Sequence, residues 1–413
     1  MKKILKISLL LIFFLLNHLL ISQTILGQYE DEAPLQTWNI LGYTSARAIG
    51  MGGIRFALSH DGSAAVVNPA LASLGPDFQV SLSGSIRSAT LFRFSLINTG
   101  PIHTSRNSNI SLYTLDHIVI SGRLQKWGFV LSAGYLENYH RPSVIAEDSI
   151  QNQVYHDIRF EQTGTLPSIS LSLSRLIAKR LSIGLGINYF KGQWSKKTQE
   201  NWYPGISITD EKTHDSSGFI VHGGLAFKIS PQTSIGAVFR APFEKKTESE
   251  NLLEFRAEQI NKTITIQTFS DNTFKQPFIA GLGGVHAFSD RLLFGLDVSF
   301  FQWSRYQIQY FGEDIERNFK DTIKIRAGLE YMIDANFFEQ TFHLPLRMGI
   351  MYDPQPMSDP ASSYVFLTLG SGLHSRRFKF DTGIALGREF GSGQNLVSMT
   401  FLATIMYEIS NQR

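Results

Sequence analysis

The feature that most constrains the fold of this chain is a period-two alternation of apolar and polar residues that recurs along most of its length. Residues 181–189 carry Leu, Ile or Tyr at every odd position and Ser, Gly or Asn at every even one. Residues 323–331 alternate in the same way, and here Lys324, Arg326 and Glu330 stand among the polar residues. Side chains of a β-strand point alternately to its two faces, so each such segment is predicted to be a strand with one apolar face.

Segments of this kind predict about 14 strands. They span residues 78–88, 115–123, 127–137, 164–175, 179–191, 217–229, 232–242, 276–288, 291–303, 322–333, 343–353, 362–373, 377–388 and 395–409. Short connections such as 124–126, 230–231 and 289–290 alternate with long ones, which we expect to be loops. These loops are 89–114, 138–163, 192–216, 243–275 and 304–321. Short turns at one end and long loops at the other are typical of an outer-membrane barrel, whose short turns face the periplasm.

The sequence therefore predicts an all-β fold, a transmembrane antiparallel β-barrel with a small N-terminal hatch in its lumen. No segment after residue 27 is apolar for long enough to form a transmembrane helix, so a membrane location requires a closed barrel. A soluble β-sandwich or propeller would also alternate. It would not need ring-rich outward faces on nearly every strand, and no propeller-blade period is visible.

Aromatic and charged residues are expected to occupy different parts of this barrel. Rings near strand ends fit interfacial girdles, namely Trp127, Tyr189, Trp303, Tyr331, Tyr352 and Tyr407. A Lys or Arg facing lipid at mid-depth would cost about 2–4 kcal/mol, so the charges of the alternating segments are expected inside. They are Arg87, Arg123, Arg240, Lys324, Arg326, Arg347, Lys379, Asp297, Glu330, Asp381 and Glu408. Such charges either pair with one another or bind a ligand carboxylate, and we expect pairing because enclosed charges need partners.

The N-terminus predicts export. Met1, Lys2 and Lys3 precede an apolar stretch over residues 7–16, as in a signal peptide that is cleaved near Gly27. A retained single-pass anchor is the alternative, although Asn17 and His18 interrupt the apolar run. We expect residues 1–27 to be the signal peptide, 28–76 the N-terminal extension and hatch, and 77–413 the barrel, in the outer membrane of a Gram-negative bacterium.

Composition excludes several classes of function. The chain has no Cys, which removes disulfides, thiolate metal sites and a lipidated cysteine, and its net charge of +3 is too small for a nucleic-acid surface. We expect no cofactor and no enzyme activity, because none of the common catalytic or phosphate-binding motifs occurs. His222 and His286 fall on presumed inner faces, without a third ligand for a metal. A lipase built on a barrel remains an alternative, since the sequence cannot show whether a Ser and a His lie side by side.

Residues 44–74 do not alternate and are dominated by small side chains. They contain Gly-Met-Gly-Gly at 50–53 and Asn68-Pro69-Ala70, which suit tight turns and close backbone approach. With these motifs the sequence resembles the FadL/TodX family of outer-membrane transporters for hydrophobic compounds, whose hatch carries a similar pattern. The resemblance covers residues 45–73 and departs after Ala70, where the family often has Gly-Leu and this chain has Leu71-Ala72-Ser73.

The resemblance implies a barrel of the same strand number that passes hydrophobic compounds, such as long-chain fatty acids, by passive diffusion through the outer-membrane lipid bilayer. It also implies that Gly52, Gly53, Asn68, Pro69 and Ala70 shape the hatch. The same N-terminal signature occurs in PorV-like barrels, which leaves type IX protein secretion or surface attachment, with protein cargo, as the alternative.

Further candidate residues follow from the transporter interpretation. The apolar segment 201–206 with Trp202 and Tyr203, and with Trp194 and Phe311 as neighbours, predicts a ligand capture groove, unless these rings only pack loop against loop. In the third predicted strand, Gly134 marks a possible kink through which a ligand would leave sideways, although lumen crowding explains this Gly equally well.

Overall fold

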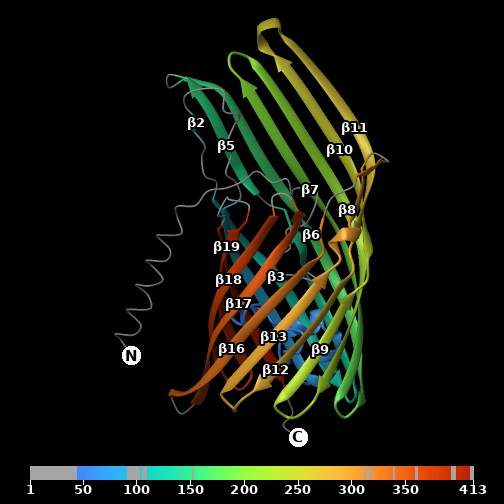
Figure 1. Ribbon diagram of the computed structural model, residues 1–413, viewed down its shortest axis with the longest axis vertical. Helices are drawn as coiled ribbons and strands as arrows, with labels where there is room; N and C mark the ends of the chain where they lie inside the picture. Colours follow the sequence, from blue (N-terminus) through green and yellow to red (C-terminus); the bar gives the residue numbers. More distant parts are fainter. Residues whose placement is uncertain are drawn as a thin grey trace.

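The chain folds into a closed antiparallel barrel of 14 strands (Figure 1). A computed structural model describes residues 44–90, 103–104, 109–139, 141–150, 153–310, 313–315, 319–337, 340–358, 361–391 and 397–409. The wall strands, in order around the barrel, are β1 Phe78–Thr90, β3 Asn109–Leu124, β4 Trp127–Asn138, β6 Gln153–Ala178, β7 Leu181–Trp202, β8 Ile206–Lys228, β9 Thr233–Arg240, β12 Ile279–Ala287, β13 Leu292–Phe301, β16 Thr322–Phe337, β17 Gln340–Ser358, β18 Ala361–His374, β19 Phe378–Phe390 and β20 Val397–Ile409. Each strand pairs with the next, and β1 pairs with β20, from Phe78 opposite Ile409 to Ala89 opposite Ser398.

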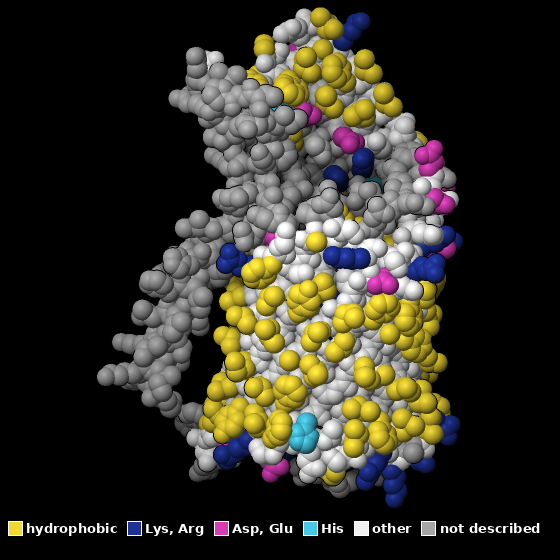
Figure 2. Space-filling model, in the orientation of Figure 1, with side chains coloured by type: hydrophobic (Ala, Val, Ile, Leu, Met, Phe, Trp, Pro, Cys, Tyr) yellow, Lys and Arg dark blue, Asp and Glu magenta, His cyan; other side chains and the backbone are white. Residues whose placement is uncertain are grey.

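Every predicted strand overlaps one of these wall strands in sequence, so the predicted fold is confirmed. The alternation has the expected cause, because apolar side chains such as Leu185 and Leu367 project outward while Ser182 and Thr368 are buried inside. Figure 2 shows the outward side chains as a band of hydrophobic residues around the wall, with Lys and Arg at its lower border. The short turns join strands at the end of the barrel that lies lowest in Figure 1, which we call the turn end.

Beyond the opposite rim, one side of the wall rises into a curved sheet that we call the extension (Figure 1). It consists of β5 Arg141–Ile150, the outer parts of β6, β7 and β8, and the hairpin of β10 Phe243–Ala257 and β11 Lys262–Gln276, paired in that order. The short helix η2, Glu258–Ile260, closes the β10–β11 hairpin. The prediction that 138–163, 192–216 and 243–275 are loops is therefore wrong.

The other two expected loops also contain strands. Segment 89–114 contains β2 His103–Thr104, which pairs with β5, and the start of β3. Segment 304–321 begins within the short helix η3, Trp303–Arg305, and contains β14 Gln307–Tyr310 and β15 Glu313–Ile315.

The extension escaped prediction because its outward face is largely polar, unlike that of the barrel. Along β7 the outward residues are apolar up to Tyr189 and then polar, beginning with Lys191 and Gln193. The inward residues are small and polar near the turn end, such as Ser182 and Gly184, and mix rings such as Trp194 with polar residues such as Lys196 further out. A wall in lipid needs apolar outward faces, whereas a wall in water does not, so the change marks the outer border of the apolar band.

Residues 44–76 fill the lumen as the hatch (Figure 1, blue). Its short helices are α2 Ala46–Gly50, α3 Gly62–Val67 and η1 Pro69–Leu74. They begin at the N-cap residues Ser45, Asp61 and Asn68, whose side chains accept hydrogen bonds from the first free backbone N–H groups. Nearly all hatch side chains are buried, and the largest apolar cluster joins them to wall residues from several strands. The hatch and the wall therefore share one core.

Several further expectations have an outcome here. Trp303 does not belong to an interfacial girdle, because η3 turns its ring into a buried cluster with Phe301, Tyr306 and Phe319. The rings of Trp127, Tyr189, Tyr331 and Tyr352 do project outward. The expected signal peptide lies outside the described residues. Among the described residues, no helix has both the length and the apolar character needed to cross a bilayer.

The alternation makes a direct prediction for stability. Leu185 lies in the middle of the outward apolar series of β7, so Leu185→Arg should lower the free energy of unfolding in lipid vesicles by about 2–4 kcal/mol. Gln193→Arg, outward on the same strand but beyond the band, should change it by less than about 1 kcal/mol. Urea titration followed by tryptophan fluorescence measures both, and equal losses would contradict the assignment of the band.

Candidate functional site

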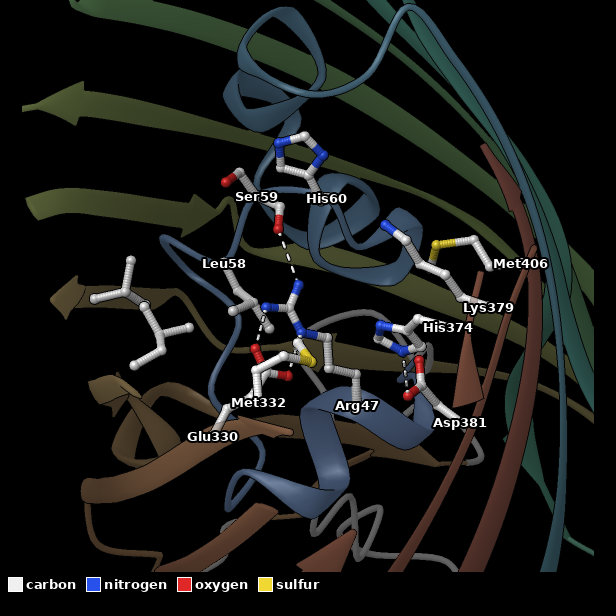
Figure 3. Close-up of a pocket in the computed structure, with 12 residues that line it drawn as sticks. Arg47, Leu58, Ser59, His60, Glu330, Met332, His374, Lys379, Asp381 and Met406 are labelled. Atoms are coloured by element: carbon white, nitrogen blue, oxygen red, sulfur yellow. Dashed lines mark hydrogen bonds and ion pairs between the residues drawn. The ribbon is translucent and has the colours of Figure 1, made fainter. Parts of the chain in front are cut away.

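Ion pairs fasten the hatch to the wall near the turn end. Arg47 of α2 donates two hydrogen bonds to the Glu330 carboxylate, at 3.0 and 2.7 Å, and one to the carbonyl of Ser59 (Figure 3). Arg347 of β17 donates to Glu330 and to Asp381, both at 2.6 Å. His374 contacts the same Asp381 oxygen at 2.8 Å. The alternating charges of this network connect α2 to four neighbouring wall strands, β16 to β19.

A second polar contact holds the middle of the hatch. The Asp297 carboxylate of β13 accepts hydrogen bonds from the backbone N–H groups of Arg55 and Phe56, at 2.7 and 3.0 Å. Burial lowers the pKa of the Arg55 guanidinium to about 9, with neighbouring Arg326 adding to the effect and Asp297 opposing it. Lys324 pairs with Asp353 at 2.6 Å beside this contact.

The remaining lumenal charges also find partners. Arg87 lies 3.1 Å from Asp116, Arg123 lies 2.9 Å from Asp77, and Lys379 lies 2.6 Å from Glu408. The Arg326 guanidinium donates to Ser299 at 2.9 Å. Arg87, Arg123 and Lys379 thus pair with carboxylates, whereas this Arg326 hydrogen bond goes to a neutral hydroxyl.

The glycine motif of the hatch serves close approach to the wall. Gly52 and Gly53 have φ of +70° and +83°, and a Cβ on Gly52 would lie 2.4 Å from the carbonyl oxygen of Ala327. Asn68 donates from Nδ2 to the carbonyls of Phe56 and Leu225, at 2.6 and 3.0 Å. Its Oδ1 accepts from the backbone N–H of Ala70, and Pro69 occupies the first turn of η1. The residues named from the motif thus set the local shape of the hatch.

A pocket of about 280 Å³ lies between the hatch and the turn end (Figure 3). Its polar lining consists of Arg47, Ser59, His60, Glu330, His374, Lys379 and Asp381, and apolar side chains such as Leu58 and Met406 complete it. The charges are those of the network that fastens the hatch, since His60 also lies 3.3 Å from Glu408. We therefore assign this pocket to hatch anchoring.

On the other side of the hatch, towards the extension, rings stack against one another in what we call the upper aromatic cluster. Trp194 stacks between Tyr139, at 4.8 Å between ring centroids, and His214, at 4.1 Å. Lys245 donates to the Tyr139 hydroxyl at 3.1 Å and lies 4.8 Å from the centroid of Phe274. The Trp194 indole N–H is buried without a hydrogen-bond partner among the described residues, which leaves one donor free inside an apolar environment.

The rings of Phe190 and Phe243 continue this cluster to a break in the wall. β9 pairs with β12 up to Arg240 opposite Ile279, and β10 pairs with β11 from Phe243 opposite Gln276. The two residues between them on each side, 241–242 and 277–278, have no ladder partners across the gap among the described residues. Pro242 and Pro277 lie here, and a proline cannot donate to a ladder. The sheet is thus interrupted where the apolar band ends.

This break holds a pocket of about 430 Å³, which we call the wall pocket. It is lined by Pro242, Phe243, Glu244, Lys275, Gln276, Pro277, Phe278, Gln302 and Arg305. Phe243 contacts lumenal Phe190 with ring centroids 5.8 Å apart, whereas Glu244 and Lys275 are exposed. The Arg305 guanidinium makes no ion pair with any described residue. The wall pocket therefore offers apolar walls, a free cation and a position between lumen and exterior.

The residues expected to capture a ligand are not brought together. Trp194 is buried in the upper aromatic cluster, whereas Trp202 and Tyr203 lie exposed at the far tip of the extension, about eight residues or roughly 26 Å further along β7. Trp202 stacks on His156 at 3.8 Å, and the Tyr203 hydroxyl donates to Asp157 at 2.7 Å. Phe311 lies outside the described residues.

Gly134 is paired on both sides, with His117 of β3 and Ser168 of β6. The irregularity in this strand lies just beyond it, where the register shifts between Tyr135 and Glu137. No group of His, Asp and Glu side chains with the arrangement of a metal site occurs among the described residues. His222 instead hydrogen-bonds the carbonyl of Val66, and His286 contacts Thr233.

Comparison with known proteins finds a family model that matches the chain and solved structures of the same architecture. A family model described as BamG matches residues 46–405. No curated protein sequence is significantly similar to the chain. Similar solved structures include the toluene transporter TbuX of Ralstonia pickettii, with TM-score 0.60, 16% identity and coverage of 90% of this chain and 99% of that one. A FadL homologue of Pseudomonas aeruginosa has a TM-score of 0.63 and 15% identity, with coverage of 88% of this chain and 98% of that one. The toluene transporter TodX of P. putida has a TM-score of 0.62 and 14% identity, with coverage of 90% of this chain and 100% of that one. At these identities the likeness concerns the fold.

The anchoring network predicts how the hatch can be loosened. Glu330→Gln removes the charge that Arg47 and Arg347 share, and breaking a buried pair costs about 3–5 kcal/mol. Hydrogen exchange of the backbone amides of residues 46–56 should then become much faster. Asp334→Asn on the same strand, whose partners Arg291 and His343 are exposed, is the matched control and should leave this exchange unchanged. Equal exchange in both variants would show that the network does not hold the hatch.

Proposed function

The chain belongs to the BamG family, and from its site we propose that it is an outer-membrane channel through which hydrophobic compounds pass by passive diffusion. The observation that carries this proposal is the wall pocket, which lies at the break in the wall and whose lining residue Phe243 contacts lumenal Phe190. The fold supports it, since the similar structures TbuX and TodX are those of toluene transporters. The turn end then faces the periplasm and the extension the cell exterior.

The hatch supports a sideways route over an axial one. Its side chains are buried and share a core with the wall, and the ion pairs of Arg47 fasten it, so a straight path along the lumen is filled with protein. A compound dissolved in the outer leaflet reaches the break at Pro242 and Pro277 without crossing water. The proposed exit or entry is therefore this break, in place of the kink that we expected near Gly134, whose ladder pairing is complete on both sides.

The lining of the wall pocket supports a substrate with an apolar body and an acidic head group. Phe243, Phe278 and the two prolines supply apolar contact, and Arg305 and Lys275 outnumber Glu244 among the charges. The Arg305 guanidinium, which has no ion pair within the described part of the chain, is well suited to bind a carboxylate. Long-chain fatty acids have an apolar chain and a carboxylate, whereas toluene can contact only the apolar lining of the pocket. Protein secretion, the alternative that the hatch motif leaves open, predicts binding of neither compound.

Arg305 tests the substrate class. We expect Arg305→Gln to weaken binding of palmitate by the purified protein in neutral detergent about fivefold to tenfold, and to leave toluene binding unchanged, because only palmitate has a carboxylate. Isothermal titration with both compounds measures the two affinities. Phe243→Ala should weaken both, and Phe227→Ala, which removes an exposed outward ring from β8, is the control. Failure of the unchanged protein to bind either compound would contradict the proposed function.

A disulfide tests the sideways route. Residue 241 stands opposite residue 278 in the register that Arg240 and Ile279 set, so the pair Ala241→Cys and Phe278→Cys should close the break under oxidising conditions. The chain has no other cysteine to interfere. We expect uptake of labelled palmitate by expressing cells to fall to background when the bond is formed and to recover on reduction.

The matched control for this experiment is the pair Ala237→Cys and Leu282→Cys, which are already ladder partners within β9 and β12. A bond at that position should leave uptake unchanged. Unchanged uptake with the break closed would exclude the wall pocket as the route.

A further inference from the structure

The extension ends in a strand edge that is open over most of its length. β11 pairs with β10 from Lys262 opposite Ala257 to Gln276 opposite Phe243. On its other side it pairs with β14 only from Thr273 to Lys275. Among the described residues, 262–272 therefore have no strand partner on that side, and Figure 1 shows β11 at the outer margin of the extension. Alternate backbone N–H and C=O groups along this edge are free to pair with another strand.

The sequence of this edge lacks the features by which proteins usually prevent such pairing. Exposed edges are normally short or carry charged residues or proline. Residues 263–270 contain neither a charge nor a proline, and half of them are β-branched Thr or Ile in a run, which favours extended backbone. The Ile264 and Ile266 side chains are 55% and 51% exposed. The edge thus has the composition of a strand that is paired on both sides.

The two faces of the extension favour different side chains on an added strand. On the concave face, Ile264 and Ile266 lie opposite Phe255 and Leu253 of β10, and Ile208 of β8 continues the row. Figure 2 shows hydrophobic side chains gathered over the upper part of the extension, separate from the band around the barrel. An added strand would extend this apolar surface with every second side chain.

The convex face carries a row of negative charge that runs to the edge. Asp215, Glu248 and Asp271 are direct cross-strand neighbours on β8, β10 and β11, and all three are exposed. Glu248 and Asp271 make no ion pair with described residues. Like charges placed directly opposite one another are unfavourable, and a cation on the next strand would relieve them. The row therefore calls for Lys or Arg beside Asp271.

We propose that the free edge of β11 binds an extended segment of a partner protein as an added strand, with apolar side chains towards the concave face and Lys or Arg on the convex face beside Asp271. This mode of recognition takes affinity from backbone hydrogen bonds and specificity from alternate side chains. A second copy of this chain does not meet the charge requirement. The only cation in residues 262–272 is Lys262, which lies on the concave face with Ile264, on the opposite side from Asp271.

Two short peptides test this proposal with the full chain in neutral detergent. One alternates Lys and Val over eight residues, and the other alternates Glu and Val. The Lys-Val peptide should bind, measured by fluorescence anisotropy, and should slow hydrogen exchange of the amides of residues 262–272. The Glu-Val peptide should bind at least about fivefold more weakly. Asp271→Lys should reverse this order of affinities. Ile266→Lys should weaken Lys-Val binding, whereas Ile260→Lys, the same change on exposed η2 beyond the strand, should not.

Several results would overturn the proposal. Equal binding of both peptides, or binding that leaves exchange of residues 262–272 unchanged, would show that the edge is not the site. An Asp271→Lys variant with the original preference would remove the role of the acidic row. Protection of residues 262–272 that rises with protein concentration in the absence of peptide would assign the edge to a second copy. None of these outcomes depends on palmitate binding, so the proposed function is tested separately.

Discussion

The structure depends on one constraint, which is that the backbone hydrogen bonds of the wall must be satisfied within the wall itself. A strand in lipid finds no water to pair with its N–H and C=O groups, and only a closed sheet leaves none of them unpaired. The pairing of β1 with β20 provides this closure. Closure in turn creates an interior that must be filled, and the hatch fills it with small residues and buried charges that pair with the wall. The break at Pro242 and Pro277 is notable because it is a local exception to this rule.

The strands of the barrel were predictable because lipid imposes the same demand on each of them. Segment 181–191, for example, shows its apolar parity without reference to any other part of the chain. The extension was not predictable from this signal, because water on its convex face allows Lys, Glu and Thr where the barrel has Leu and Ile. The β10–β11 hairpin therefore resembled a polar loop, although its run of Thr and Ile at 263–266 was a strand signal. Trp303 was misassigned because β13 ends at Phe301 and η3 redirects the ring.

The candidate site was predictable only in part. The hatch motif indicated Gly52 and Asn68, since positive φ and backbone capping are local properties. Arg47 escaped because its partner Glu330 is distant in sequence and its pairing depends on how the hatch is seated. The sequence does contain a signal for the wall pocket. Pro242 and Pro277 stand at the facing ends of two predicted strands, 232–242 and 276–288, where neither can donate to a ladder. Recognising that they face each other required the register of β9 and β12.

The proposals for the pocket and for the edge of β11 both rest on the border at which the outward face of the wall changes from apolar to polar. Single cysteines along residues 181–201 of the otherwise cysteine-free chain, spin-labelled and reconstituted in lipid vesicles, measure this border directly. Spin labels at odd positions up to 189 should have their relaxation enhanced by oxygen dissolved in the lipid. Labels at odd positions from 191 onward should respond to a water-soluble nickel complex, and labels at even positions below 190 should be accessible to neither agent. Nickel access at odd positions throughout, or the absence of any alternation, would contradict the account.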